Sequence, residues 1–371
     1  MKKSLPEARQ VVRVMRVHAC ERRCLHLALL LAGFAPLSNA QTIQWDGGAG
    51  GGTAWLTGTN WAGDATPGAL NTAEFAGAGT ATIIGVTMSN PTNNGTANQI
   101  VGMIRQVGGS ARTVRNGSTT TPGTLTLAGV GGVLLENTSA NNLSITDGTS
   151  QVMNLQFQSA GNINVTSSGL ITISSSIIGT NGFVKTGSGR LDLTNSGGSS
   201  HTGTVTLQEG TLRIANGAAA LGALPTSPTQ VVFLEAGTFI ADTTSNSGTN
   251  RQFGIGPASG AGAATIETPA GREFTISGVI GDNNAGTGSL IKTGDGTLVL
   301  GNGSNTYSGT TTIQAGVLSI SSGTSLGPAP GSPAEKIFIN GGSLRLAASF
   351  ALSSNRGIVI GPSSGSGTGT I

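Results

Sequence analysis

A long internal repeat constrains the fold of this 371-residue chain more than any other feature of its sequence. Residues 183–193 (FVKTGSGRLDL) return as residues 290–300 (LIKTGDGTLVL), 107 positions later. Later matches, such as Leu221 with Leu326, have an offset of 105, because two residues are lost in loops rich in Gly, Ser and Pro. Loops tolerate such deletions when the elements between them are kept. The repeat therefore predicts stacked structural units rather than one globular core.

Short stretches of alternating apolar and polar residues lie between glycine-containing turns in each unit. Examples are residues 297–300 (TLVL), 310–313 (TTTI) and 317–320 (VLSI). Alternation with a period of two predicts strands with one buried face, and Gly or Asn between them suits the corners. The pattern predicts an all-β chain folded as a parallel β-helix, or β-solenoid, with roughly 20–25 residues in each coil. A β-sandwich array is the alternative, and it would need aromatic core anchors that the repeat units lack.

The chain is expected to divide into a cleavable signal peptide, an N-terminal cap, degenerate coils and two repeat units. The second unit is expected to be truncated at Ile371, so that the chain is the N-terminal piece of a longer protein. The predicted boundaries are 1–40 for the signal peptide, 41–80 for the cap, 81–182 for the degenerate solenoid coils, 183–289 for unit 1 and 290–371 for unit 2.

Positions 1–40 have the three parts of a secretory signal peptide. Residues 1–24 are basic, residues 25–35 are apolar, and Ser38-Asn39-Ala40 supplies small residues before a cleavage site between Ala40 and Gln41. The apolar part is shorter than the roughly 20 residues that a membrane-spanning helix needs. Met1 and Met15 are both possible starts, since residues 15–40 alone have the ordinary length of a signal peptide.

Removal of this leader changes the charge and the cysteine content of the chain. The leader holds seven basic and two acidic residues, which leaves 12 basic against 14 acidic residues and no cysteine in the remainder. Without a basic surface, we expect no nucleic-acid partner. A secreted chain without disulfides must be held together by hydrogen-bond ladders and stacked side chains.

The candidate catalytic and binding residues each have a simpler structural explanation, so we expect no catalytic residue, no cofactor and no metal site. His201 is the only histidine after the leader, but the repeat aligns it with Tyr307. Asp192 and Glu209 could approach on neighbouring coils as a pair of carboxylates, but their counterparts are Val299 and Ala315, which favours ordinary solvent-facing positions. Two further candidates are weaker, since Asp295 suits a turn rather than Ca²⁺ and Ser363 lacks the helix that a nucleophile elbow needs.

Three tryptophans, Trp45, Trp55 and Trp61, lie close together near the predicted N-terminus of the secreted chain. The chain contains no other tryptophan. The end of a solenoid must be covered, which favours a cap over a site where aromatic rings stack on sugars.

Residues 290–327 resemble the autotransporter-associated β-strand repeat, also called the passenger-associated transport repeat. The resemblance rests on KTGDGTL at 292–298, NTYSGTTTI at 305–313, GVL at 316–318 and LG at 326–327. Residues 183–222 are a weaker copy, in which Arg190 and the run SSHT at 199–202 depart from the pattern. The motif positions in the two copies are Lys185, Gly187, Gly189, Leu191, Gly203 and Gly210, and Lys292, Gly294, Gly296, Leu298, Tyr307, Gly309, Gly316 and Leu326.

The resemblance implies a β-helical passenger segment that is secreted and displayed at the outer surface of a Gram-negative-type cell. Such repeats are associated with export and stalk building, so the implied function is structural or adhesive rather than catalytic. The implied partners are surface glycans, host or matrix components, and the outer-membrane export machinery. The alternatives are a β-helical carbohydrate-active enzyme or carbohydrate-binding module, and a secreted matrix protein without a fixed fold.

Overall fold

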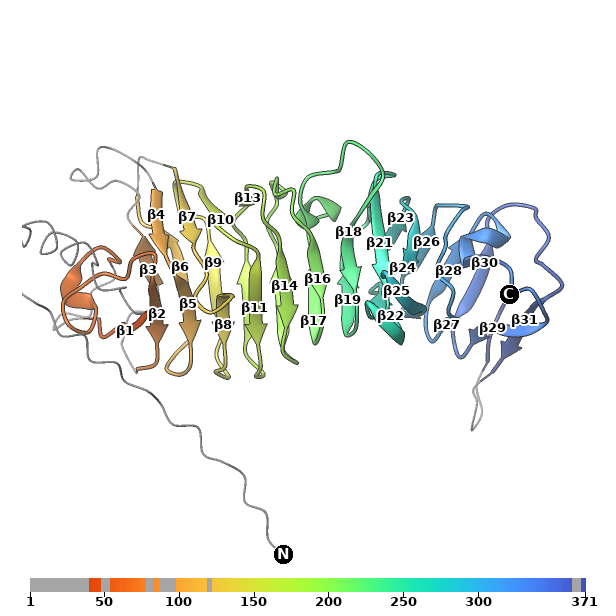
Figure 1. Cartoon of the computed structure of the whole chain (residues 1–371), viewed down its shortest axis with the longest axis horizontal. Coiled ribbons are helices and arrows are strands. Elements are labelled where there is room, and N and C mark those ends of the chain that lie inside the picture. Colours follow the sequence, from red (N-terminus) through yellow and green to blue (C-terminus); the bar gives the residue numbers. More distant parts are fainter. Residues whose placement is uncertain (1–39, 48–53, 78–82, 87–97, 119–121, 362–367) are drawn as a thin grey trace, which may run out of the picture. The chain divides into compact units, whose positions relative to one another are not determined.

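The computed structural model describes residues 40–47, 54–77, 83–86, 98–118, 122–361 and 368–371, and residues 40–371 form one compact unit. This part consists of strands β1 to β31 and three short 3₁₀ turns, η1 (Gly58–Asn60), η2 (Ala218–Leu221) and η3 (Gly323–Leu326). Every pairing between these strands is parallel, which confirms the predicted β-helix (Figure 1). No helix in the described ranges has the length and apolarity to cross a membrane. The predicted signal peptide lies outside these ranges, apart from Ala40, and stays a prediction.

The chain winds through three faces in turn, and each face is a parallel sheet or a pair of such sheets. The first face contains β1 (Gln41–Gln44), β2 (Asn71–Phe75), β5 (Met103–Gln106), β8 (Val133–Asn137), β11 (Gly161–Val165), β14 (Phe183–Thr186), β16 (Val205–Leu207), β18 (Thr229–Leu234), β21 (Arg251–Ile255) and β24 (Ile280–Asp282). The second face contains β3 (Ile83–Val86), β6 (Arg112–Asn116), β9 (Leu143–Thr146), β12 (Leu170–Ile173), β15 (Arg190–Leu193), β17 (Thr211–Ile214), β19 (Thr238–Ala241), β22 (Ser259–Glu267), β25 (Ala285–Thr293), β27 (Thr311–Ile313), β29 (Ala334–Ile339) and β31 (Arg356–Ile360).

The third face is interrupted and consists of two smaller sheets. One contains β4 (Asn98–Val101), β7 (Gly123–Leu127), β10 (Met153–Phe157) and β13 (Ile177–Ile178), and the other contains β20 (Ser245–Asn246), β23 (Glu273–Ile276), β26 (Thr297–Leu300), β28 (Val317–Ile320) and β30 (Ser343–Leu346). Successive coils lie side by side, so that each strand covers the strand of the coil before it (Figure 1).

The core is a set of side-chain columns inside the coils. On the third face, Leu125, Leu155 and Ile177 are in register on three successive strands, and all three are buried. Strand alternation places every second residue inside, and each fully buried Leu or Ile contributes roughly 1.5–3 kcal/mol. The short apolar runs of the sequence therefore give many thin core layers.

Coil length differs along the chain. Ahead of the repeat, Ile104 pairs with the distant Leu135, whereas within the repeat Phe183 pairs with the nearer Val205. Val205 in turn pairs with Val232, which is again a longer coil. The predicted coil length is therefore too short for most coils ahead of the repeat and for every second coil within it, whereas Gly161 pairs with Phe183 in a coil of the predicted length. Loops of different length are added between strands that keep their register.

The repeat unit does not span a whole number of coils. Strands β14 and β15, which begin unit 1, lie on the first and second faces, whereas their equivalents β25 and β26 lie on the second and third faces. Between β14 and β25 the chain completes four coils and then advances by one face. Unit 2 is therefore turned by one face relative to unit 1.

The irregular parts of the two units consequently lie on different faces. We name these segments the His201 arc (194–204) and the η2 arc (215–228) in unit 1, and the Tyr307 arc (301–310) and the η3 arc (321–333) in unit 2. The His201 arc stacks on the third face, where Ser200 N donates to Ile177 O at 2.9 Å. The Tyr307 arc stacks on the first face, where Thr306 N donates to Ile280 O at 2.8 Å.

Aromatic side chains are part of the core both near the N-terminus and within the repeat. Trp45, Trp55 and Trp61 are all buried, with ring centroids 4.9 Å apart for Trp45 and Trp61 and 4.8 Å apart for Trp55 and Trp61. None of the three rings offers an exposed face to a sugar. Unit 1 also buries Phe183, Phe239, Phe253 and Phe274. The expectation that the units lack aromatic anchors is therefore wrong, and parallel pairing rather than aromatic content excludes the sandwich.

Candidate functional site

A buried lysine closes the turn after the first strand of each repeat unit. Lys185 Nζ donates to the carbonyls of Thr186, Gly187 and Glu209 at 2.8, 2.7 and 3.2 Å. The side chain has no exposed surface. Burial lowers its pKa to about 8, against an opposing contribution from Glu209. Three carbonyl acceptors match the three donors of an ammonium group, so this lysine joins two neighbouring coils.

Lys292 repeats this arrangement in unit 2. Its Nζ donates to the carbonyls of Thr293 and Gly294 at 2.6 Å and of Ala315 at 3.3 Å. It is also fully buried, and burial lowers its pKa to about 8. The repeated Lys-Thr-Gly motif therefore encodes a contact between coils rather than a reactive amine.

The glycine after each lysine is required by the backbone. Gly187 and Gly294 have φ values of +73° and +72°, a region that residues with a side chain rarely adopt. A Cβ atom at Gly294 would lie 2.4 Å from Thr268 O on the preceding coil. The turn therefore needs glycine both for its conformation and for its close approach to the preceding coil.

The remaining motif residues are core or turn positions. Leu191, Leu298 and Leu326 are buried, Gly210 and Gly316 are turn glycines with positive φ, and Gly189, Gly203, Gly296 and Gly309 lie directly before strands or in the turns that lead to them. Of the predicted cleavage residues, Ala40 is exposed and Gln41 begins β1.

His201 and Tyr307 occupy equivalent buried positions. Each is 1% exposed, although each lies in an arc rather than in a strand. Tyr307 Oη shares a 2.8 Å hydrogen bond with Thr311 Oγ1. Neither ring nitrogen of His201 has a hydrogen-bond partner in the described part of the chain, and burial lowers its pKa to about 4. A histidine that is neutral, buried and unpartnered is not placed to act as a general base for a bound substrate.

A buried arginine fastens the 3₁₀ turn of each unit to the following coil. Arg356 donates to the carbonyls of Leu326 and Gly327 at 2.8 Å each. Arg251 donates to the carbonyl of Gly222, the counterpart of Gly327, at 2.6 Å. Burial lowers the pKa of both arginines. This role was not predicted from the sequence, although the repeated pair Asn250-Arg251 and Asn355-Arg356 was a visible signal.

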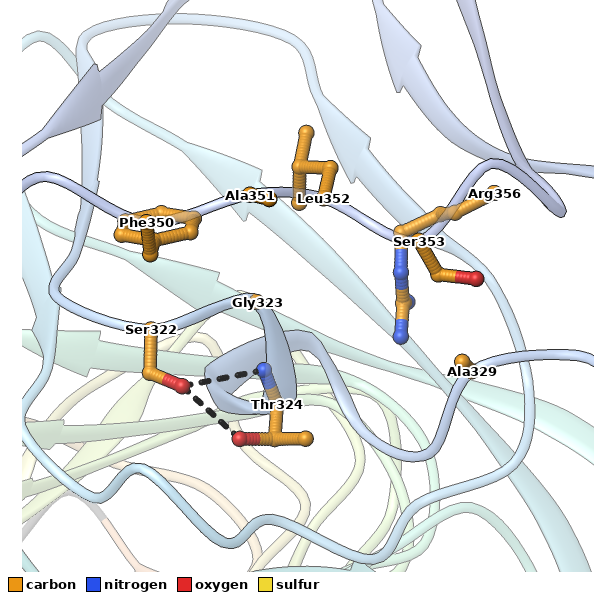
Figure 2. A pocket seen from close by; sticks show the side chains of 9 residues that line it. All are labelled: Ser322, Gly323, Thr324, Ala329, Phe350, Ala351, Leu352, Ser353 and Arg356. Atoms are coloured by element: carbon orange, nitrogen blue, oxygen red, sulfur yellow. Dashed lines mark hydrogen bonds between the residues drawn. The ribbon is translucent and has the colours of Figure 1, made fainter.

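Each of these arginines lines a hollow beside its 3₁₀ turn, and the two hollows are equivalent under the repeat. Figure 2 shows the hollow of unit 2, in which Ser322 Oγ accepts a hydrogen bond from Thr324 N at 3.3 Å. The linings are Ser322, Gly323, Thr324, Ala329, Phe350, Ala351, Leu352, Ser353 and Arg356 in unit 2, and Ala218, Ala219, Gly222, Leu224, Asn246, Ser247, Gly248 and Arg251 in unit 1. Asn246 and Ser247 are replaced by Ala351 and Leu352, so the two hollows occupy equivalent places in the repeat but differ in the chemistry of their lining.

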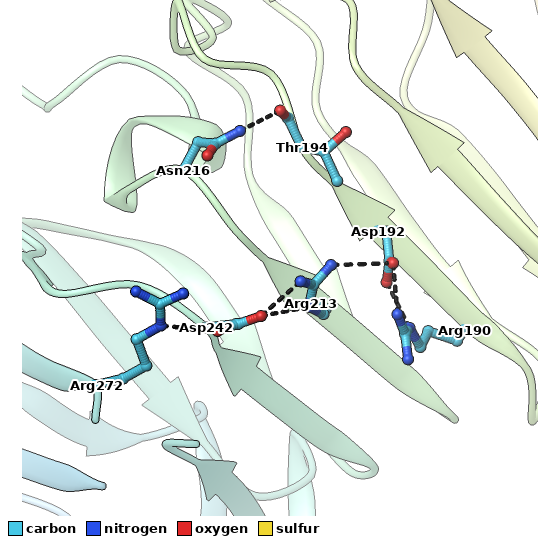
Figure 3. Close-up of polar contacts among 7 residues, drawn as sticks. All are labelled: Arg190, Asp192, Thr194, Arg213, Asn216, Asp242 and Arg272. Atoms are coloured by element: carbon cyan, nitrogen blue, oxygen red, sulfur yellow. Dashed lines mark hydrogen bonds and ion pairs between the residues drawn. The ribbon is translucent and has the colours of Figure 1, made fainter. Parts of the chain in front are cut away.

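Charged side chains on the second face and its edge pair with one another across successive coils (Figure 3). Asp192 binds Arg190 at 2.6 Å and Arg213 at 3.2 Å. Asp242 continues the ladder, with Arg213 at 2.5 Å and Arg272 at 3.0 Å. Although burial raises the pKa of Asp242, hydrogen bonds from the two arginines lower it overall. Because each of these carboxylates is paired with two guanidinium groups, little unpaired charge remains that could bind a ligand.

The structure corrects the interpretation of Asp192 as an ordinary solvent-facing residue. Its side chain is 7% exposed and held between two guanidinium groups. Glu209 is exposed and contributes its backbone carbonyl to Lys185. Asp295 is exposed in the turn between β25 and β26, and Ser363 lies outside the described residues. Within the described ranges, no group of three or more His, Cys, Asp or Glu residues is placed to hold a metal ion.

Comparison with known proteins identifies the repeat. The model of the passenger-associated transport repeat matches residues 183–214 and 290–320, the two segments that contain the buried lysines. The chain is 32% identical over 282 residues to the adhesin BmaC autotransporter of Brucella suis biovar 1 (strain 1330). This match covers 72% of the chain but only 8% of that relative. No solved structure matches the chain significantly.

The matches agree with the structure, because both matched segments contain the lysine, glycine and leucine residues that form the turn and core contacts described above. The chain therefore carries two copies of the passenger-associated transport repeat and is similar, over most of its length, to a short part of an autotransporter adhesin.

Proposed function

We propose that residues 41–371 form a non-catalytic stalk within a longer adhesin-like passenger that is displayed at the surface of a Gram-negative-type cell. The observation that carries this proposal is the similarity to an autotransporter adhesin over 72% of the chain. The whole passenger would contact surface glycans or host and matrix components, and it would reach the surface through the outer-membrane export machinery.

Two features of the structure support a stalk. Strands of successive coils pair along the whole described chain, so that backbone hydrogen bonds run from coil to coil. Buried and charged side chains are also used between coils, as the lysines, arginines and the Asp192 ladder show. Such a molecule resists unfolding because each unit is stabilised by its neighbours.

The proposal is tested with purified residues 41–371. We expect a cooperative loss of β-type circular dichroism on heating, and no turnover of plant or bacterial polysaccharides. A chain without a cooperative transition would instead be a matrix protein without a fixed fold.

The enzyme alternative has its own control. Turnover that disappears in an Asp192→Asn/Glu209→Gln variant, but survives in Asp295→Asn, would show a carbohydrate-active enzyme and overturn the proposal. Asp295 is the matched control because it is an exposed acid in a turn of the same repeat.

A further inference from the structure

His201 is the most deeply buried residue of its arc. Its ring centroid lies 6.3 Å from that of Phe183 on β14, and its backbone N–H donates to Ile177 O on β13. A Cβ atom added at Gly222 would lie 2.9 Å from Nε2, so the ring lies directly against the η2 arc. The His201 carbonyl also accepts a hydrogen bond from Ala223 N at 2.9 Å. The η2 arc therefore packs directly on His201.

Arg251 on β21 holds the same arc from the following coil. Its guanidinium donates to the carbonyls of Ala218 at 3.0 Å and Gly222 at 2.6 Å. Its positive charge also opposes protonation of His201. The other elements around the ring present the backbone of Ile177 from β13, the ring of Phe183 from β14 and Gly222 directly after η2. An imidazolium at this position would thus be a second buried cation beside Arg251, and the backbone carbonyl of Ile177 favours its charge less than burial opposes it.

We propose that the η2 arc is an acid-operated latch, in which protonation of His201 releases residues 215–228 from the third face. Opening of the arc lets water reach the imidazolium, which removes the cost of burying an unpaired charge. Release would also expose Ala220 and Leu221, which are buried in the closed arc. The latch would therefore present an apolar surface only in acid.

The direction of the pH effect follows from linkage. Burial is the largest cause that lowers the pKa of His201, and it brings the pKa to about 4, below the ordinary histidine value of 6.5. The open arc therefore binds the proton more tightly than the closed arc. Stability of the closed arc is complete above pH 6.5 and is lost as the pH falls towards 4. These two pKa values correspond to roughly a 20-fold rise in the opening constant between pH 7 and pH 5.

Unit 2 is a control within the same molecule. Tyr307 takes the place of His201, and burial raises its pKa to about 12, so that it stays neutral throughout. Arg356 fastens the η3 arc as Arg251 fastens the η2 arc. The η3 arc therefore packs on Tyr307 and is held by Arg356 in the same way, but neither residue titrates in acid.

Hydrogen exchange of residues 41–371 at pH 7 and pH 5, corrected for intrinsic rates, tests the latch. We expect the opening constant at Ala220, Gly222 and Ala223 to rise roughly 20-fold in acid, while Ser325 and Gly327 of the η3 arc stay unchanged. His201→Tyr should abolish the rise, and Tyr307→His should confer it on the η3 arc.

Three outcomes would overturn the proposal. One is an equal acid effect on both arcs, and another is an unchanged effect in His201→Tyr. If the variant does not fold, titration of His201 by NMR in the wild-type chain replaces it, because residues 41–371 contain no other histidine. A pKa of His201 near 6.5 in the folded protein would then exclude the latch.

Discussion

At the residue scale, the stability of this β-helix depends on cations that are buried among backbone carbonyls rather than beside carboxylates. Lys185, Lys292, Arg251 and Arg356 are each at most 7% exposed, and backbone carbonyls are the acceptors for all four. Turns between parallel strands leave carbonyl groups without a strand partner, and a buried polar group without a hydrogen bond is costly. One cation at a turn donates hydrogen bonds to several carbonyls at once. A few buried charged residues are therefore enough to satisfy the turns.

Lys292→Met should destabilise the C-terminal coils by about 3 kcal/mol, because three carbonyls lose their donor. Methionine keeps the apolar stem of the side chain, so that the loss reports on the hydrogen bonds. The measurement is the free energy of unfolding in urea, followed by circular dichroism.

Lys336→Met is the matched control for this change. Lys336 donates to Ser308 O at 2.8 Å through an exposed hydrogen bond, and removal of an exposed contact should change the stability by less than about 0.5 kcal/mol. Equal effects of the two substitutions would contradict the role assigned to Lys292.

At the scale of elements, strand and arc are stabilised in different ways. Strands gain from in-register pairing and from buried columns such as Leu125, Leu155 and Ile177. The η2 and η3 arcs have few ladder bonds and are each fastened by the arginine of the next coil. An arc can therefore open without loss of the strands on either side.

Arg356→Met should open the η3 arc and leave β28 and β29 closed. The arginine donates two hydrogen bonds to Leu326 O and Gly327 O, and their loss corresponds to about 2–3 kcal/mol of local stability. Hydrogen exchange at Ser325 and Gly327 should accelerate by at least about 10-fold.

Arg345→Met is the control for the arginine clamp, since Arg345 has a half-exposed side chain and lies on the neighbouring strand β30. It should leave exchange in the η3 arc unchanged. Acceleration in both variants, or in neither, would show that Arg356 does not fasten the arc.

At the scale of the whole unit 40–371, the repeat and the coils follow different periods. The repeat advances by four coils and one face, so equivalent arcs point away from different sides of the β-helix. A third unit of the same length would place its arcs on the second face, and a fourth would restore the arrangement of the first. Any surface that the repeat encodes is thus presented around the axis rather than along one side.

Spin labels at Ser227 and Ser332 test this rotation. The two residues are equivalent, exposed and located in the η2 and η3 arcs. A separation along the axis alone would be about 21 Å, from four and one third coils of about 4.8 Å. We expect a clearly longer distance by pulsed electron paramagnetic resonance, because the labels lie on different faces. A measured distance equal to the axial separation would contradict the rotation.

The sequence was sufficient for the class of fold and for the local chemistry of the repeat. Alternation placed Leu191 and Leu298 in buried strands, and the Lys-Thr-Gly run marked the turns that follow β14 and β25. These are local properties, since they depend on strand period, on glycine at positive φ and on residues close together in the chain.

Tertiary structure was needed for everything that depends on which residues of different coils meet. Asp192 lies beside Arg213, and Arg251 reaches Gly222, because parallel strands one coil apart in the chain pair in register. Loop lengths set that spacing and also turn unit 2 by one face, and neither effect is visible in the offset of the repeat. Local alternation thus specified the strands and turns, whereas the register between coils determined the buried cations, the charge ladder and the position of each arc.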